Sequence, residues 1–76
     1  MIRVRLYGLL RIDSGIKERQ PEAASVKEVL EDLERCGIPG KKLEASVILV
    51  NGRPANKRTK LTDGDTVVFM SPVAGG

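Results

Sequence analysis

The residues best placed for chemistry are residues 71–76, which read SPVAGG and stand at the end of the sequence. Residues 66–70 precede them and are rich in β-branched and aromatic side chains, which predicts a buried strand. Because Pro72 has no N–H to donate to a sheet ladder, we expect the strand to end just before it. The six residues span at most about 20 Å, at about 3.3–3.6 Å each, which is far enough to enter a partner's active site.

Gly75 and Gly76 have a physical use at such an end. Without a Cβ atom, the backbone can pass through a narrow channel and leave the Gly76 carboxylate open to attack. Many chain ends are simply frayed, but this one follows a predicted core strand directly, so its base should be fixed. We therefore expect Gly76 to be the reactive residue, and the chain to divide into a folded domain (residues 1–70) and a flexible tail (residues 71–76).

Side chains capable of catalysis are scarce elsewhere. The sequence has no histidine, which excludes imidazole metal sites and histidine-based acid–base catalysis. Asp63 and Asp65 could be metal ligands or an acid–base pair, but no third ligand is near them and Asp63-Gly64-Asp65 is typical of a turn. We expect no metal site and no autonomous hydrolase.

The single cysteine, Cys36, is the other candidate for sulfur chemistry. It could be a reactive thiol or a sulfur relay, but it lies three residues after Leu33 on the apolar side of a predicted helix. We therefore favour a small buried hydrophobe. One cysteine allows no internal disulfide and fits a reducing compartment.

Composition limits the class of protein. The 76 residues suit one soluble domain, with 41% hydrophobic and 30% charged residues. No apolar run is long enough for a membrane span and no signal peptide is recognisable, so we expect a cytoplasmic protein without membrane contact. The net charge of +3 is too small to indicate nucleic acid. Residues 53–60 hold four cations and no acid, which could dock an acidic partner or a nucleotide but is more typical of a solvated loop.

The elements that must position the tail follow from periodicity. Residues 2–7 alternate as a strand, residues 16–20 suit a short edge strand, and residues 46–50 form a continuous apolar strand. Residues 25–36 form the one clear helix, with capping-box spacing between Ser25 and Glu28 and an apolar stripe of Val26, Val29, Leu30 and Leu33. Asn51-Gly52 predicts a type I′ hairpin. Residues 9–15 are ambiguous between a helical turn and a loop, and residues 40–44 are predicted to be a basic linker.

A small sheet with one helix has one face uncovered. Yet the last strand is apolar on both faces, since Val67 and Phe69 alternate with Val68 and Met70, and such a strand must be buried on both. The second face therefore needs residues 9–12 or another protein. We expect Val68, Phe69 and Met70 to belong to a partner interface near the tail.

Four segments together resemble the MoaD/ThiS family of ubiquitin-like sulfur carriers: MIRVRLYG (residues 1–8), LVNG (49–52), LTDGD (61–65) and FMSPVAGG (69–76). The resemblance covers essentially the whole chain. It is closer to the small subunit of molybdopterin synthase than to the thiazole sulfur carrier, because an aromatic- and proline-rich run usually precedes Val-x-Gly-Gly in that branch. Here Met70 and Ser71 stand where the branch often has a second aromatic residue and a first proline.

The resemblance implies an α+β, ubiquitin-like β-grasp fold, with a mixed sheet of four to five strands packed on one main helix. It also implies that an E1-like adenylyltransferase uses ATP to form an acyl-adenylate at Gly76, and that a persulfide donor then leaves a thiocarboxylate. The large subunit of molybdopterin synthase would receive the sulfur for the pterin dithiolene. Pro72, Val73 and Ala74 would fit the partner's channel with Gly75, and the chain itself would bind no cofactor.

Two other functions share these features. The chain could be a protein modifier joined through Gly76 to a lysine, or a sulfur carrier for thiamine thiazole or another pathway. A nucleic-acid-binding β-grasp module using the basic residues 57–60 is less favoured. The chain has only two aromatic residues, too few for base stacking.

Overall fold

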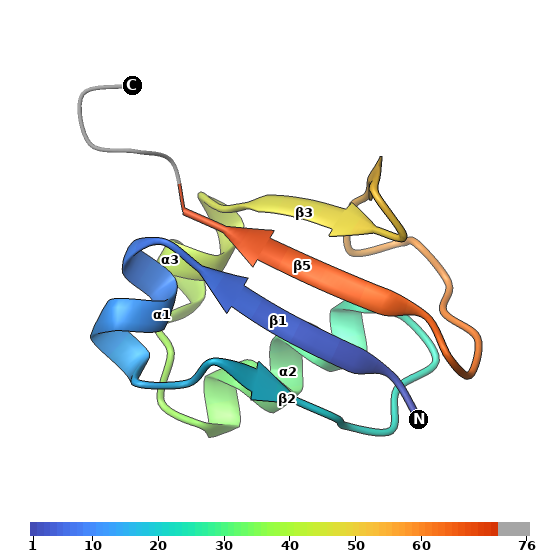
Figure 1. Cartoon of the computed structure of the whole chain (residues 1–76), viewed down its shortest axis with the longest axis horizontal. Helices are drawn as coiled ribbons and strands as arrows, with labels where there is room; N and C mark the ends of the chain where they lie inside the picture. Colours follow the sequence, from blue (N-terminus) through green and yellow to red (C-terminus); the bar gives the residue numbers. More distant parts are fainter. Residues whose placement is uncertain (72–76) are drawn as a thin grey trace.

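The computed structural model describes residues 1–71, in which five strands form one mixed sheet (Figure 1). The strands are β1 (Arg3–Tyr7), β2 (Glu18–Arg19), β3 (Val47–Val50), β4 (Arg53–Pro54) and β5 (Thr66–Met70). The helices are α1 (Leu9–Ser14), α2 (Val26–Arg35) and α3 (Gly40–Glu44). The strand order is β2-β1-β5-β3-β4, so the first and last strands of the chain lie side by side at the centre. The predicted fold class is confirmed.

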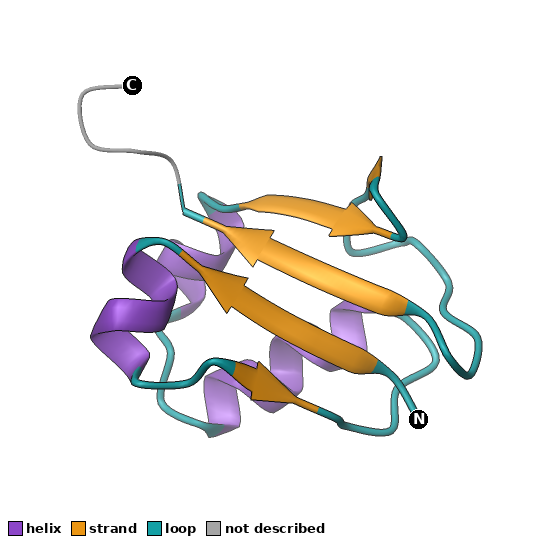
Figure 2. Cartoon of the chain, in the orientation of Figure 1, coloured by secondary structure: helices purple, strands orange, loops and turns teal. Residues whose placement is uncertain are grey.

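The two central strands, β1 and β5, are parallel, and the other strand pairs are antiparallel. Helices α2 and α3 lie behind the sheet in Figure 2, whereas α1 lies at the end where β1 and β5 both finish. One face of the sheet is thus covered by helix, as an α+β arrangement requires. Among residues 1–71, no helix is long and apolar enough to cross a membrane.

The core forms between α2 and the inner face of the sheet. Val26, Val29 and Leu33 of α2 are buried in one cluster with the inward residues of β1 and β5. Leu30, on the same predicted stripe, is only partly buried at the border of this cluster. The Ser25 side chain accepts a hydrogen bond from the Glu28 N–H, so the predicted helix start is confirmed.

The end of α2 corrects the expectation for Cys36. The Ile38 N–H donates to the Leu33 carbonyl at 3.2 Å and the Gly37 N–H donates to the Glu34 carbonyl at 2.9 Å, with Gly37 at φ 101°. This is a Schellman ending, in which the residue after the glycine folds back onto the helix. Ile38 therefore takes the buried position, and Cys36, at the C-cap, is exposed.

Two segments outside the main helix are more ordered than the sequence indicates. Residues 40–44, expected as a linker, form α3 and bury Leu43 in the core. Residues 9–14 form α1, which buries Leu10. The Lys42 ammonium lies 2.8 Å from an Asp13 carboxylate oxygen and joins the two short helices. Each of the two short helices buries a single leucine, so neither shows the repeated apolar spacing that predicts a helix from sequence.

The hairpin prediction is confirmed. Asn51 and Gly52 have φ values of 51° and 83°, and they connect Val50 directly to its pairing partner Arg53. Positive φ at both central positions is the signature of a type I′ turn. The predicted edge strand at residues 16–20 is shorter in the structure, where only Glu18–Arg19 pairs with β1.

Candidate functional site

The strand register decides which residues of β5 can meet a partner. Val67 and Phe69 face the helices and are fully buried, whereas Val68 and Met70 lie on the opposite, outer face. The expectation that Phe69 belongs to a partner interface is therefore corrected, because its side chain has 0% exposure. Val68 and Met70 remain available on the surface.

The register also brings other strands to the outer face beside them. Met70 lies between Tyr7 of β1 and Val47 of β3, and Val68 lies between Arg5 and Leu49. Together the apolar members form what we call the sheet-face patch: Tyr7, Val47, Leu49, Val68 and Met70. Val47 is 49% exposed and Met70 is 42% exposed, values that are high for large apolar side chains on central strands.

Two further exposed apolar residues lie on α1, at the end of the sheet where β1 and β5 finish (Figure 1). Leu9 and Ile12 lie at i and i+3 of this helix, and Ile12 is 74% exposed. Exposed apolar residues therefore occur both on the outer face at the end of β5 and on the helix beside that end. Sequence reasoning missed Tyr7, Val47 and Leu49, because their membership depends on which strands pair and in which register.

Basic side chains lie beside the patch on β1, next to the edge strand β2. The Arg5 guanidinium carbon lies 5.6 Å from the centroid of the Tyr7 ring, a cation–π arrangement that orients both side chains. Glu18 of the edge strand lies within 4.0 Å of both Arg3 and Arg5, at 3.9 and 3.6 Å. Two arginines share one carboxylate, so this border of the patch carries an excess of positive charge.

Ser71 is the last residue that the structure describes. Its hydroxyl oxygen accepts a hydrogen bond from the Leu9 N–H at 2.6 Å, which attaches the end of β5 to the start of α1. The predicted site residues Pro72, Val73, Ala74, Gly75 and Gly76 lie outside the described residues. Next to these residues the structure describes Met70, a member of the sheet-face patch with Tyr7 and Val47 on either side, and Ser71, the residue after it.

The two acidic residues of the turn at residues 63–65 contact only groups of the fold itself among the described residues. Asp65 accepts hydrogen bonds from the Thr62 N–H at 2.8 Å and from the Asn51 amide at 3.0 Å. These bonds, the Thr62 backbone bond first, stabilise the carboxylate and lower the pKa of Asp65 below its usual value. Asp63 pairs with the terminal ammonium of Met1. Within residues 1–71, no three acidic or cysteine side chains gather as a metal site would require.

The basic segment at residues 53–60 begins in strand β4 (Arg53–Pro54) and continues as an ordered loop. Asn56 and Thr59 hold it through hydrogen bonds to each other and to the Arg58 N–H. Its backbone also docks on the start of α2, where the Val26 N–H donates to the Thr59 carbonyl at 2.9 Å. Its four cations are exposed, and none forms an ion pair with another residue of the described part of the chain.

Comparison with known proteins places this architecture in a family. The model of the ThiS family matches residues 4–76. No curated protein matches the chain in sequence.

Three solved structures illustrate the likeness. One is the complex of subunits 1 and 2 of molybdopterin-converting factor from Helicobacter pylori 26695, with 27% identity, a TM-score of 0.72, and 99% of this chain and 97% of that chain covered. The Amycolatopsis orientalis BexX/CysO complex has 25% identity and a TM-score of 0.74, with both chains covered fully at 100%.

The third is SAMP1 from Haloferax volcanii, with 20% identity, a TM-score of 0.82, and 99% and 98% of the two chains covered, and it supports the fold. The first two neighbours were solved together with a second protein. The chain belongs to the ThiS family, a family of ubiquitin-like sulfur carriers with the β-grasp fold.

Proposed function

We propose that this chain carries sulfur as a thiocarboxylate on Gly76 and delivers it to molybdopterin synthesis. The observation that carries the proposal is that the family match extends through Gly76 itself, so that it includes the glycine pair as well as the folded body. The 27% identical neighbour from a molybdopterin-converting factor supports the choice of pathway.

The first step is activation of a poor electrophile. The Gly76 carboxylate attacks the α-phosphate of ATP in an E1-like adenylyltransferase, pyrophosphate leaves, and an acyl-adenylate forms. The terminal sulfur of a persulfide then attacks the acyl carbon and AMP leaves. A thiol cleaves the resulting S–S bond by exchange, which gives the thiocarboxylate and a mixed disulfide.

The second step is delivery. In the large subunit of molybdopterin synthase, the thiocarboxylate sulfur acts as the nucleophile that builds the dithiolene of the pterin. This chain contributes the sulfur atom and the terminal residues that carry it, while the catalytic side chains belong to the partners. Five residues separate Ser71 from the reactive carboxyl group, which sets a maximum reach of about 18 Å.

The sheet-face patch is the surface that we assign to these partners. Val68 and Met70, with Tyr7 and Val47 beside them, offer apolar area at the end of the sheet where Ser71 lies. Burial of such area is worth about 25 cal/mol per Å², so it can hold the body of the carrier while the terminal residues engage the active site.

The test is ATP–pyrophosphate exchange by the cognate adenylyltransferase. Deletion of Gly76, or addition of one residue after it, should abolish exchange, because the carboxylate moves by about 3.3–3.6 Å and misplacement by even 1 Å can cost about 100-fold in rate. Cys36→Ser is the matched control and should exchange at the parent rate. Parent-rate exchange by the shortened and extended proteins would exclude Gly76 as the activated residue.

A further inference from the structure

The end of β5 and the start of α1 share an unusual cap. The first N–H groups of a helix have no partner within the helix, and a side chain at the N-cap commonly accepts one of them. In α1 the N-cap is Gly8, which has no side chain to offer. The acceptor comes instead from Ser71, 62 residues away, whose hydroxyl lies 2.6 Å from the Leu9 nitrogen.

The local geometry fits this contact closely. Tyr7 and Met70 are the last paired residues of the parallel strands β1 and β5, so Gly8 and Ser71 are the next residue of each chain segment. A Cβ atom on Gly8 would lie only 2.5 Å from the Ser71 hydroxyl oxygen. Gly8 also has φ 68°, a region that favours glycine. Glycine at this position lets the two backbones approach closely enough for the bond.

The hydrogen bond holds the residue that directly precedes residues 72–76. Because Pro72 follows, the backbone of Ser71 is already biased away from the helical region toward extended geometry. The hydrogen bond to Leu9 adds a second constraint, which ties Ser71 to the helix that carries Leu9 and Ile12. Strand pairing of Met70 with both Tyr7 and Val47 supplies a third constraint from the residue before.

We propose that Ser71 is a positioning residue that fixes the starting point of the reactive terminus relative to the sheet-face patch. This inference rests on the proposed activation of Gly76. With the body held by the patch and Ser71 held by Leu9, the residues after Ser71 start from a defined point, which favours the reactive geometry in the adenylyltransferase. Loss of the Ser71 hydroxyl should lower the rate of adenylation in the bound complex. The affinity for the adenylyltransferase should stay unchanged, because Ser71 adds no area to the patch.

The experiment measures kcat and KM for pyrophosphate exchange with the wild type, Ser71→Ala, Ser71→Thr and Ser14→Ala. Ser14 is the matched control: its hydroxyl bonds to the Leu10 carbonyl at 2.6 Å, at the other end of the same helix. Ser71→Ala should lower kcat about fivefold to tenfold with KM within about twofold, whereas Ser71→Thr retains the hydroxyl and should restore the rate. Amide exchange of Leu9 should accelerate in Ser71→Ala alone.

The outcomes separate this inference from the function on which it rests. If the wild type exchanges but Ser71→Ala has an unchanged kcat, the positioning role is wrong and the carrier function stands. Equal losses in Ser71→Ala and Ser14→Ala would also overturn the positioning role, because the effect would then come from the stability of α1. Failure of Ser71→Thr to recover activity would do the same. A wild type that supports no exchange would reject the carrier function, and this inference with it.

Discussion

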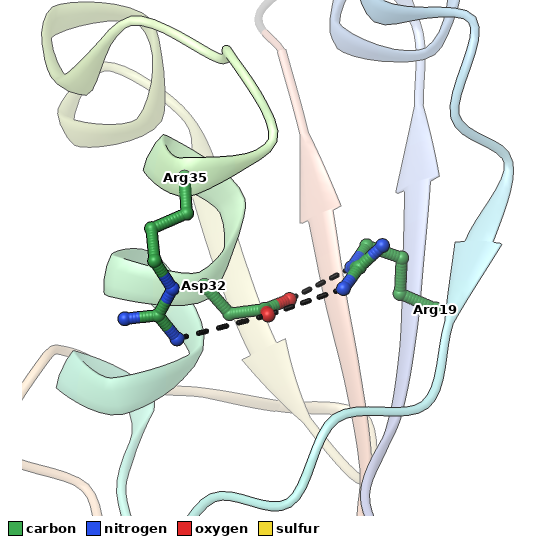
Figure 3. A network of polar contacts seen from close by, with 3 residues as sticks. All are labelled: Arg19, Asp32 and Arg35. Carbon is green, nitrogen blue, oxygen red and sulfur yellow. Dashed lines mark hydrogen bonds and ion pairs between the residues drawn. The ribbon is translucent and has the colours of Figure 1, made fainter.

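Arg19 and Asp32 form a two-point ion pair that joins the edge strand β2 to helix α2 (Figure 3). The Arg19 Nε donates to Asp32 Oδ2 at 2.7 Å, and one terminal nitrogen donates to Oδ1 at 3.1 Å. The hydrogen bond to Asp32 raises the pKa of Arg19 further above its usual range. The contact adds to the backbone pairing of β2 with β1 and to the ion pairs of Glu18 with Arg3 and Arg5.

The first prediction is that Asp32→Ala destabilises the domain by about 1 kcal/mol, since a bidentate pair at the surface is worth more than an ordinary exposed pair but remains screened. Arg35→Ala is the control. Its guanidinium lies 3.9 Å from the same carboxylate and the side chain is 74% exposed, so no measurable loss is expected. Urea unfolding measures both. Equal losses would contradict the assignment of the pair to Arg19.

The second prediction concerns the core face of α2. Leu33→Ala should cost about 2–5 kcal/mol, because the side chain is fully buried and its removal leaves a cavity. Leu30→Ala should cost clearly less, since Leu30 lies at the border of the core with partial exposure. Thermal and urea unfolding provide the comparison, and a larger loss for Leu30 would show that the helix is rotated from its described position.

Hydrophobic spacing and turn chemistry in the sequence predict the main helix and the hairpin. The stripe of Val26, Val29 and Leu33 defines α2, and Asn51-Gly52 defines the hairpin, because each signal is local. Phe69 was misplaced because its face depends on a non-local strand pairing, whereas Cys36 was misplaced because of the local ending of α2. The inner face of β5 follows from pairing with β1, and the exposure of Cys36 follows from Ile38 folding back onto the helix.

Short elements were also beyond sequence reasoning. Helix α3 has five residues and a single buried side chain, Leu43, so no repeat can indicate it. For the site, Val68 and Met70 were expected to belong to a partner interface; the structure places both on the outer face of the sheet, and the interface itself stays a prediction. Tyr7 and Val47 join them only through strand pairing, and the contact of Ser71 with Leu9 links two ends of the sequence.

The third prediction is a pH dependence of stability. The pKa of Asp65 is lower in the folded state than its usual value of 3.8, because hydrogen bonds from Thr62 and Asn51 favour the carboxylate. In the window between the two pKa values the unfolded chain binds more protons, so stability is fully present above the usual pKa and is lost as pH falls through the folded value. Urea midpoints measured across the acid range should therefore fall less steeply for Asp65→Asn than for the parent.

Glu22→Gln serves as the control for this measurement, since Glu22 has no side-chain hydrogen bond or ion pair among residues 1–71. Its acid limb should follow that of the parent. An identical acid limb for parent and Asp65→Asn would mean that the turn network does not stabilise the fold.

The fourth prediction tests the sheet-face patch. Met70→Glu places a charge in the middle of the apolar surface and should weaken binding to the adenylyltransferase by at least about tenfold, as expected for a residue at the centre of an interface. The fold should persist because Met70 faces away from the core. Lys41→Glu on α3 is the control and should bind as the parent does. Titration calorimetry measures both, and unchanged binding by Met70→Glu would place the interface elsewhere.

If Gly76 carries sulfur, the intact mass of the protein purified from its own cells will reveal it. We expect a species heavier than the unmodified chain by the difference between one sulfur and one oxygen atom, and fragmentation should place that difference on Gly76. Treatment with an alkylating reagent should then label the terminus. If the only form found has an unmodified carboxylate, or one joined to a lysine of another protein, the chain does not act as the proposed sulfur carrier.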